Sequence, residues 1–424
     1  MSPEYSGIVG LIFRTLRYRN YRLFFAGQCI SLIGNWVQQI ALGWLVYRLT
    51  DSVLFLGIVA FAVQFPTFLF SPLAGVFSDR WNRRRTLVLT QGLSMLQALS
   101  LAVLVLTGTI AVWHIILLSL SLGCVNAIDI PTRQSFVIHM IEEKKDLSNA
   151  IALNSAIFTG ATFVGPALAG LLITLFGEGI CFLLNGVSYI AVIAALLSMN
   201  VSRIAPERKN TNIFQELKEG LNYAFDFKPI RFILLLLALT SFMGVPYTVL
   251  MPAFARDILH SGPHTLGFLM SASGAGALIG AIYLAARKSI LGLGRIIPLA
   301  SGIFGAGLIG FSLYPVFWLS LLLMTIIGFG AVVQVASSNT LLQTIVEDNK
   351  RGRVMSLFAV SFMGMAPLGS LMAGTLAGII GITTSIMFGG ICCIMGAIFF
   401  ARKLSLLRSI IRPIYADNGI VNLN

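Results

Sequence analysis

Charged residues are scarce in this chain, and their scarcity excludes an ordinary water-soluble domain. Of its 424 residues, 11% are charged and 57% are hydrophobic, whereas a soluble domain carries roughly a quarter charged residues. The mean hydropathy is +0.89. Polar residues fall in short stretches between apolar runs of roughly 20 residues, which is the length of a helix that crosses a bilayer. The composition therefore predicts an all-α membrane protein.

The sequence also has few of the groups that metal or covalent chemistry requires. Its four histidines are dispersed, and its five cysteines lie in apolar runs without a CxxC pair. We therefore expect no metal site, no disulfide, no cofactor and no catalytic centre. A Walker-type GxxxxGK[ST] motif is missing, so ATP is not expected to drive the protein directly. These observations disfavour a membrane-embedded enzyme.

Apolar runs long enough to span a membrane number about twelve, with six in each half of the chain. They cover approximately residues 23–47, 53–77, 86–107, 111–131, 148–176, 179–199, 230–255, 265–286, 296–314, 316–340, 354–379 and 382–401. The longest polar stretch separates the sixth run from the seventh. We therefore predict an N-terminal half over residues 1–200, a linker over 201–228 and a C-terminal half over 229–424.

Positive charge is distributed asymmetrically along the chain. If the N-terminus is cytoplasmic, all but two of the 29 Lys and Arg lie on the cytoplasmic side, the exceptions being Arg48 and Arg256. Retained cytoplasmic loops carry such an excess. Both termini are therefore expected in the cytoplasm, in a multi-pass protein of the inner membrane. The net charge of +13 is spread over turns rather than clustered, so nucleic acid is not an expected partner.

A basic motif follows the second apolar run. It reads G-V-F-S-D-R-W-N-R-R from Gly75 to Arg84 and resembles the G-x-x-x-D-R-x-G-R-R signature of the major facilitator superfamily. The resemblance implies two six-helix bundles that move a small molecule by alternating access. It also implies a cytoplasmic gate, in which Asp79 contacts the N-terminal end of the eleventh helix. The residues assigned to this gate are Gly75, Asp79, Arg80, Arg83, Arg84 and Arg133.

Two departures from the signature bear on this gate. Asn82 stands where the signature has glycine, and asparagine tolerates a left-handed backbone better than most residues, so we expect the tight turn to be kept. The matching segment of the second half has Leu284 at the carboxylate position, so the motif is degenerate there. Positive-inside charge alone is the alternative explanation for the arginines, although it does not explain Asp79.

The fifth apolar run contains a candidate kink. Gly165, Pro166 and Gly170 resemble the G-P-x-x-G-G motif of the superfamily's exporters, with Ala169 in place of one glycine. Proline removes a backbone hydrogen bond, and small residues let helices approach closely. Because small residues at this spacing are common in any membrane bundle, ordinary packing is the alternative interpretation.

Other segments narrow the resemblance to one branch of the superfamily. Gly34-Asn35-Trp36 and residues 126–134 resemble the branch that holds enterobactin exporters and macrolide efflux proteins. In this superfamily the first, fourth, seventh and tenth helices surround a cavity, so polar residues on them are candidates for cargo binding. These are Ser31, Asn35, Gln38, Gln39, Asn126, Tyr247 and Gln334. Hydrogen bonding between neighbouring helices is the alternative role for each.

Asp129 in the fourth run is the candidate proton carrier. The other acids lie in predicted loops or near the outer ends of the runs, and ionisable residues at membrane depth usually serve a function. A salt bridge with Arg133 is the alternative role, although Pro131 between them can end the helix.

The expected function is secondary active transport. We expect a proton-coupled exporter of an amphipathic small molecule, such as a siderophore or drug-like compound. Import of a small nutrient is the alternative, and a non-transporting sensor is disfavoured. The expected partners are the small-molecule cargo, a proton and the lipid bilayer, and a monomer is compatible with the sequence.

Overall fold

The computed structural model describes residues 14–78, 82–141, 143, 146–199, 222–223, 225–287 and 289–417. In this part of the chain the secondary structure is helical, without strands. The first half contains a short 3-10 helix and six long helices: η1 (Arg14–Arg17), α2 (Arg19–Thr50), α3 (Val53–Ser78), α4 (Arg83–Leu106), α5 (Val112–His139), α6 (Leu147–Phe176) and α7 (Glu178–Ser198).

Helices of the second half are more often interrupted. They are α9 (Lys228–Leu239), η3 (Thr240–Gly244), α10 (Tyr247–Ala253), η4 (Phe254–Ile258), α11 (Pro263–Ala285), α12 (Leu293–Leu313), α13 (Phe317–Ile345), α14 (Asp348–Ala359), η5 (Val360–Gly364), α15 (Met365–Ile380), α16 (Ile382–Arg402) and α17 (Leu404–Asp417). The segments η3, η4 and η5 are π-helical turns.

Among the described residues, 12 helical segments are long and apolar enough to cross a membrane. The seventh runs from α9 through η4 over Lys228–Ile258, and the eleventh runs from the first turn of α14 through η5 to the end of α15 over Lys350–Ile380. The all-α class and the predicted number of spans are thus confirmed. The predicted linker over 201–228 lies mostly outside the described residues, so its boundaries stay a prediction.

The chain divides into two compact units. The first unit contains residues 1–51, 62–209 and 262–271, and the second contains 52–61, 210–261 and 272–424. Each unit therefore takes one short segment from the opposite half of the sequence.

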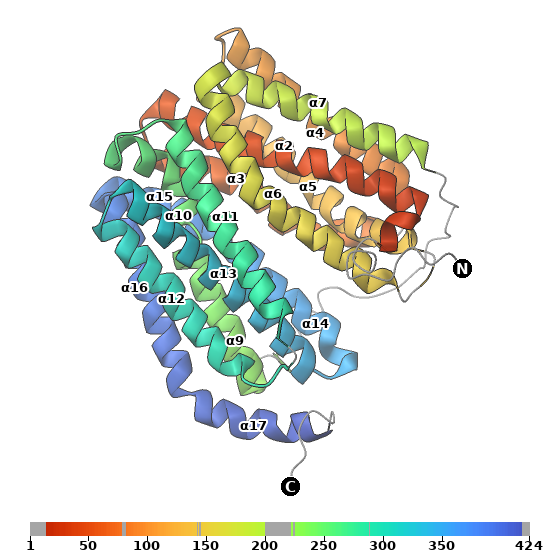
Figure 1. Ribbon diagram of the computed structural model, residues 1–424, viewed down its shortest axis with the longest axis vertical. Coiled ribbons are helices and arrows are strands. Elements are labelled where there is room, and N and C mark those ends of the chain that lie inside the picture. Colours follow the sequence, from red (N-terminus) through yellow and green to blue (C-terminus); the bar gives the residue numbers. More distant parts are fainter. Residues whose placement is uncertain are drawn as a thin grey trace. The chain divides into compact units, whose positions relative to one another are not determined.

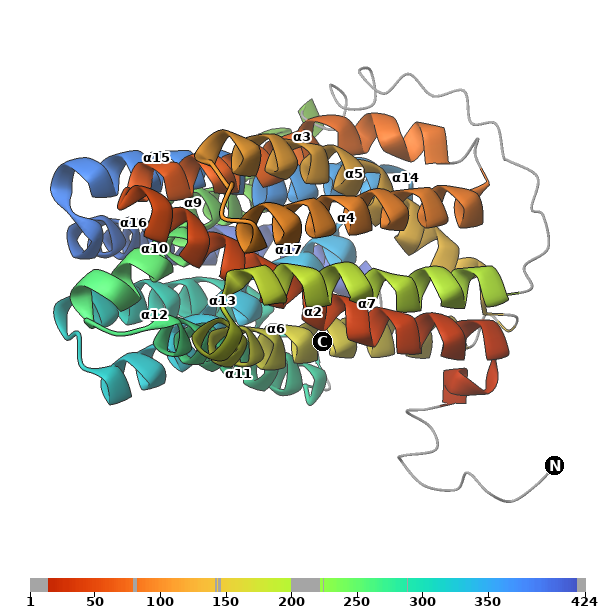
Figure 2. The same cartoon turned by 90° about the horizontal axis from the view of Figure 1, so that it is seen from above.

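In the first unit, α2 packs against α6 and α7, and α4 packs against α5 and α7 (Figures 1 and 2). Small residues make this close packing possible. A Cβ atom at Gly34 of α2 would lie only 2.5 Å from the side-chain oxygen of Asn185 on α7. A glycine at this position lets polar side chains of the two helices meet inside the unit.

In the second unit, α12 packs against α13 and α16. Glycines again lie at the crossings: a Cβ atom at Gly305 of α12 would come within 2.6 Å of the Gly390 carbonyl oxygen on α16. The π-helical turns η3 and η5 also meet, because the Ser241 hydroxyl donates a hydrogen bond to the Phe362 carbonyl oxygen. Such turns interrupt the regular helix and occur often at functional sites.

Candidate functional site

The predicted polar face of α2 meets polar side chains from α4 and α7. Asn35 Oδ1 accepts hydrogen bonds from the Tyr189 hydroxyl at 2.6 Å and from Asn185 Nδ2 at 3.3 Å. Asn185 Nδ2 also donates to Gln38 Oε1 at 2.8 Å, and Gln38 Nε2 donates to Gln97 Oε1 at 3.0 Å. We call these five residues the amide cluster. It lies within the first unit, inside the apolar spans.

The polar residues predicted to share one face of α2 differ in how far they are buried. Ser31 and Gln38 are buried, Asn35 is half-buried, and Gln39 is exposed. Burying an amide in an apolar span costs free energy unless it is hydrogen-bonded, and the cluster supplies most of the bonds required. Gln97 Nε2, however, is buried without a hydrogen-bond partner among the described residues. This amide group is therefore a donor to which a further acceptor can bind.

Asp129 forms a second polar centre on α5. Its Oδ1 accepts hydrogen bonds from the Thr90 hydroxyl at 2.7 Å and from Gln91 Nε2 at 2.9 Å, both on α4. Its Oδ2 lies 3.7 Å from Arg133 Nε, and Arg133 Nη1 donates to Gln28 Oε1 of α2 at 3.0 Å. The Asp129 side chain is 6% exposed. We call this group the carboxylate centre.

Pro131 does not end α5, which corrects the reading that it separates Asp129 from Arg133. The helix runs unbroken from Val112 to His139 with Pro131 inside it. The two side chains therefore sit one helical turn apart on a continuous helix, the spacing at which an acid and a base can pair.

Helices α2 and α4 each carry residues of both centres. Gln28 and Asn35 lie on α2, and Gln91 and Gln97 lie on α4. A displacement of either helix at the carboxylate centre would thus act on the amide cluster. Neither Tyr189 nor Asn185 was among the residues singled out from the sequence. The available signal was the recurrence of polar residues on one face of the sixth apolar run.

Only part of the gate motif lies within the described residues. Asp79 and Arg80 lie outside them, and Gly75 lies in α3. Arg84 donates to the carbonyl oxygens of Leu196 at 2.7 Å and Leu197 at 2.6 Å, in the last turn of α7. Unpaired carbonyl groups there favour a cation. Arg83 also has an interaction partner.

Asn82 does not have the left-handed backbone expected of it. Its φ is −70° and its ψ is 103°, and its side-chain oxygen accepts a hydrogen bond from the Arg85 backbone N–H at 3.2 Å. It is therefore the N-cap of α4, a role for which asparagine is among the preferred residues. The departure from glycine is explained by this cap.

The candidate kink residues lie inside one continuous helix, α6. A Cβ atom at Gly165 would clash with Trp36 of α2, and one at Gly170 would come within 2.8 Å of the Pro263 carbonyl oxygen. Both glycines thus permit close contact within the first unit. Pro166 between them is buried.

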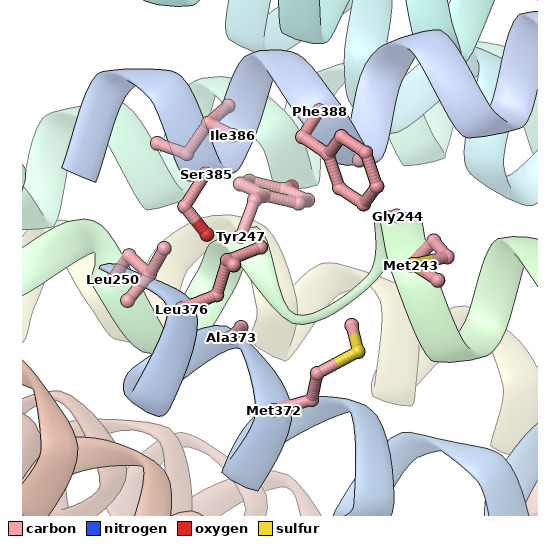
Figure 3. Close-up of a pocket in the computed structure, with 11 residues that line it drawn as sticks. Met243, Gly244, Tyr247, Leu250, Met372, Ala373, Leu376, Ser385, Ile386 and Phe388 are labelled. Atoms are coloured by element: carbon pink, nitrogen blue, oxygen red, sulfur yellow. The ribbon is translucent and has the colours of Figure 1, made fainter. Parts of the chain in front are cut away.

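The remaining cargo candidates are Asn126, Tyr247 and Gln334, and the last two hydrogen-bond to residues outside the amide cluster. Asn126 is half-buried on α5. In the second unit, the Tyr247 hydroxyl lies 3.0 Å from the Ser273 hydroxyl, and Gln334 Nε2 donates to the Thr240 hydroxyl at 2.9 Å. Tyr247 borders a cavity of about 10 Å³, also lined by Ser385 and Phe388 (Figure 3). That volume holds roughly one water molecule, so this cavity is too small for a cargo.

A buried acid that was not predicted lies between the helical spans α5 and α6. Asp146 is 1% exposed and pairs with Arg14 Nε at 2.9 Å and Arg17 Nη2 at 2.8 Å. It also accepts a hydrogen bond from the Tyr18 hydroxyl at 2.8 Å. The hydrogen bond to Tyr18 and the neighbouring acids raise the pKa of Arg17. These contacts tie η1 and the start of α2 to the start of α6.

The chain matches known proteins over most of its length. A family model described as transmembrane secretion effector matches residues 12–410. The staphyloferrin A transporter of Staphylococcus aureus (strain NCTC 8325 / PS 47) is 29% identical over 391 residues, covering 91% of this chain and 97% of that protein. Macrolide efflux protein A of Streptococcus pyogenes is 24% identical over 400 residues, covering 89% of this chain and 96% of that protein.

A solved structure supports the fold. A bacterial homologue of the iron transporter ferroportin, in an inward-facing state, superposes with a TM-score of 0.69 at 16% sequence identity. The superposition covers 91% of this chain and 99% of that one. At this identity the likeness concerns the fold alone.

Proposed function

Because the chain belongs to the transmembrane secretion effector family of the major facilitator superfamily, we propose that it exports an amphipathic small molecule by proton-coupled alternating access. The resemblance noted in the sequence is confirmed by the family match. The chain is a multi-pass transporter of the inner membrane and not an enzyme. The proposed cargo class is a siderophore or drug-like compound, because the names of two relatives describe transport of staphyloferrin A and efflux of macrolides.

The amide cluster is the observation that carries this proposal. Five polar side chains from α2, α4 and α7 meet inside apolar spans, where polar groups are costly and usually serve a purpose. Amides can both donate and accept hydrogen bonds, so they can exchange partners with the hydroxyl and carbonyl groups of a cargo. Gln39, next to this cluster on α2, is exposed and is proposed to make the first contact.

Asp129 is proposed to carry the proton. In its ionised form the carboxylate accepts bonds from Thr90 and Gln91 and faces Arg133. Protonation removes the negative charge that holds Arg133 beside it. The partners of Asp129 and Arg133 lie on α4 and α2, which also carry Gln97 and Asn35, so a movement of these helices would reach the amide cluster. The residues of the gate motif keep the role that the family resemblance implies for them.

Comparative mass spectrometry tests the proposed cargo and direction. Spent medium and cell extracts are compared between strains with and without the protein, grown iron-replete and iron-starved. We expect a compound that is depleted from the medium and enriched in the cells of the deletion strain. A matching compound depleted from the cells instead would indicate import and contradict the proposal. As a control, the deletion strain carries a plasmid that encodes the Asp226→Asn variant. Asp226 is exposed and lies far in the sequence from both polar centres, so this variant should restore the compound to the medium.

A further inference from the structure

The amphipathic helix α17 follows the last span and lies against the ends of other helices. Leu407 and Ile411, one turn apart, are buried in a cluster that includes Ile233 of α9 and Phe400 of α16. The residues that follow each of them, Arg408 and Arg412, are exposed. Figure 1 shows α17 turning away from the direction of α16. The helix thus presents an apolar face to the other helices of the second unit, and its exposed arginines lie beside that face.

A cavity of about 270 Å³ lies under this helix. Its apolar lining includes Ile233, Leu341 and Phe400, and it is bordered by the start of α12 at Gly294. The volume is close to the lower end for ligand sites, roughly 300 Å³. Because the wall is formed by aliphatic and aromatic side chains, the space suits a hydrocarbon chain better than a polar solute.

Three arginines line the same cavity, and none of the described residues that line it is acidic. Arg295 of α12 joins Arg408 and Arg412 of α17 at its edge, and all three are exposed. None of the three side chains has a hydrogen bond or ion pair with another residue that the structure describes. The guanidinium fork matches phosphate oxygens. A cluster of three arginines beside an apolar cavity is therefore complementary to an anion that carries a hydrocarbon chain.

From this juxtaposition we propose that the cavity binds one anionic phospholipid of the cytoplasmic leaflet, with its phosphate on the three arginines and part of an acyl chain among the apolar residues. Assignment to that leaflet rests on the proposed cytoplasmic position of the C-terminus. Basic pockets at the cytoplasmic ends of membrane helices are suited to acidic headgroups. Bound lipid would fix α17 against the second unit, because one molecule would contact α12, α16 and α17 together.

Native mass spectrometry of the purified full chain tests this site. The protein is incubated with phosphatidylglycerol or with phosphatidylcholine of the same acyl chains, and bound lipid is counted. We expect at least about tenfold more phosphatidylglycerol than phosphatidylcholine to be retained. Retention of phosphatidylglycerol should fall at least about tenfold in the triple variant Arg295→Gln, Arg408→Gln, Arg412→Gln. The measurement is made in detergent, so it does not depend on transport or on the orientation of the chain.

Two further variants separate a site from general attraction to positive charge. The triple variant Arg22→Gln, Arg85→Gln, Arg402→Gln removes three exposed arginines outside the cavity and should retain lipid as the wild type does. Gly294→Leu keeps every charge and fills the cavity, since a Cβ atom there meets only Leu404 Cδ1 at 3.6 Å. It should therefore fold and lose lipid.

Several outcomes would overturn the proposal. Equal loss in the two triple variants, or full retention in Gly294→Leu, would mean that lipid binds by surface charge alone. Displacement of phosphatidylglycerol by millimolar inorganic phosphate would mean that the arginines bind a free anion. If the triple variant does not elute as a single folded species, the single variant Arg412→Gln and Gly294→Leu decide the result.

Discussion

Gln38 and Gln39 are neighbours in the chain but occupy different surroundings. Gln38 is buried and bonded to Asn185 and Gln97, whereas Gln39 is exposed. Gln38 thus has the contacts of a link between helices, and Gln39 is the residue proposed to make the first contact with a cargo.

We predict that Gln38→Ala destabilises the protein and that Gln39→Ala does not. Loss of the Gln38 amide leaves Asn185 and Gln97 short of partners, and each buried unpaired group costs about 1–3 kcal/mol. Gln39→Ala should raise the KM for the cargo with an unchanged melting temperature. Thermal unfolding in detergent and flux in proteoliposomes check the two halves of this prediction. An unchanged melting temperature for Gln38→Ala would show that the cluster is not structural.

At the residue scale the sequence predicts that a polar residue matters but not which residue it meets. Asn35 and Gln38 stand out because amides are rare inside apolar runs. Their partners Gln97 and Tyr189 come from other spans, 59 and 154 residues away in the sequence. A helical periodicity gives the face of one helix, and the neighbour of that face is decided by packing. For this reason Asn185 and Tyr189 were missed.

Among the helices, α6 has glycines at its close contacts with neighbouring segments. Gly165 and Gly160 are one and a half turns apart on this helix, and they differ in what surrounds them. A Cβ atom at Gly165 would clash with Trp36 of α2, whereas nothing lies within 4 Å of one at Gly160. The glycine that resembles the exporter motif is thus the one in close contact.

Gly165→Ala is expected to destabilise the protein, while Gly160→Ala should be neutral or stabilising. An added methyl group in a packed contact typically costs about 1–3 kcal/mol. Alanine in an open helical position gains up to about 1 kcal/mol over glycine. The melting temperatures of the two variants give the comparison. Equal melting temperatures would mean that the contact between α6 and α2 relaxes around an added methyl group, and would contradict this role of Gly165.

At the element scale, the predicted spans agree with the observed helices because hydrophobic length is a direct requirement of the bilayer. Single residues predicted the local backbone less well than hydrophobic length predicted the spans. Pro131 lies inside α5 although proline usually ends a helix, and Asn82 is an N-cap rather than a left-handed turn. The π-helical turns η3, η4 and η5 had no signal in the sequence. Two of them, η3 and η5, are joined by the hydrogen bond between Ser241 and Phe362, a contact between residues far apart in the sequence.

For the whole molecule, the family and the all-α fold are confirmed. The orientation of the chain in the membrane, which the distribution of Lys and Arg predicts, stays a prediction. The sequence also directed attention to Asp129, which the structure places in a hydrogen-bonded centre with Arg133. It did not predict the cavity beneath α17, because the lining comes from the ends of several helices.

Proton-driven flux through the purified protein is the most direct test of this account. The wild type, Asp129→Asn or the exposed control Asp226→Asn is reconstituted into proteoliposomes that contain the exported compound. Flux of the compound is recorded with and without an imposed pH gradient. We predict that the gradient accelerates flux at least about tenfold in the wild type and in Asp226→Asn, and has no effect on Asp129→Asn. A gradient response retained by folded Asp129→Asn would contradict the proposed role of this carboxylate.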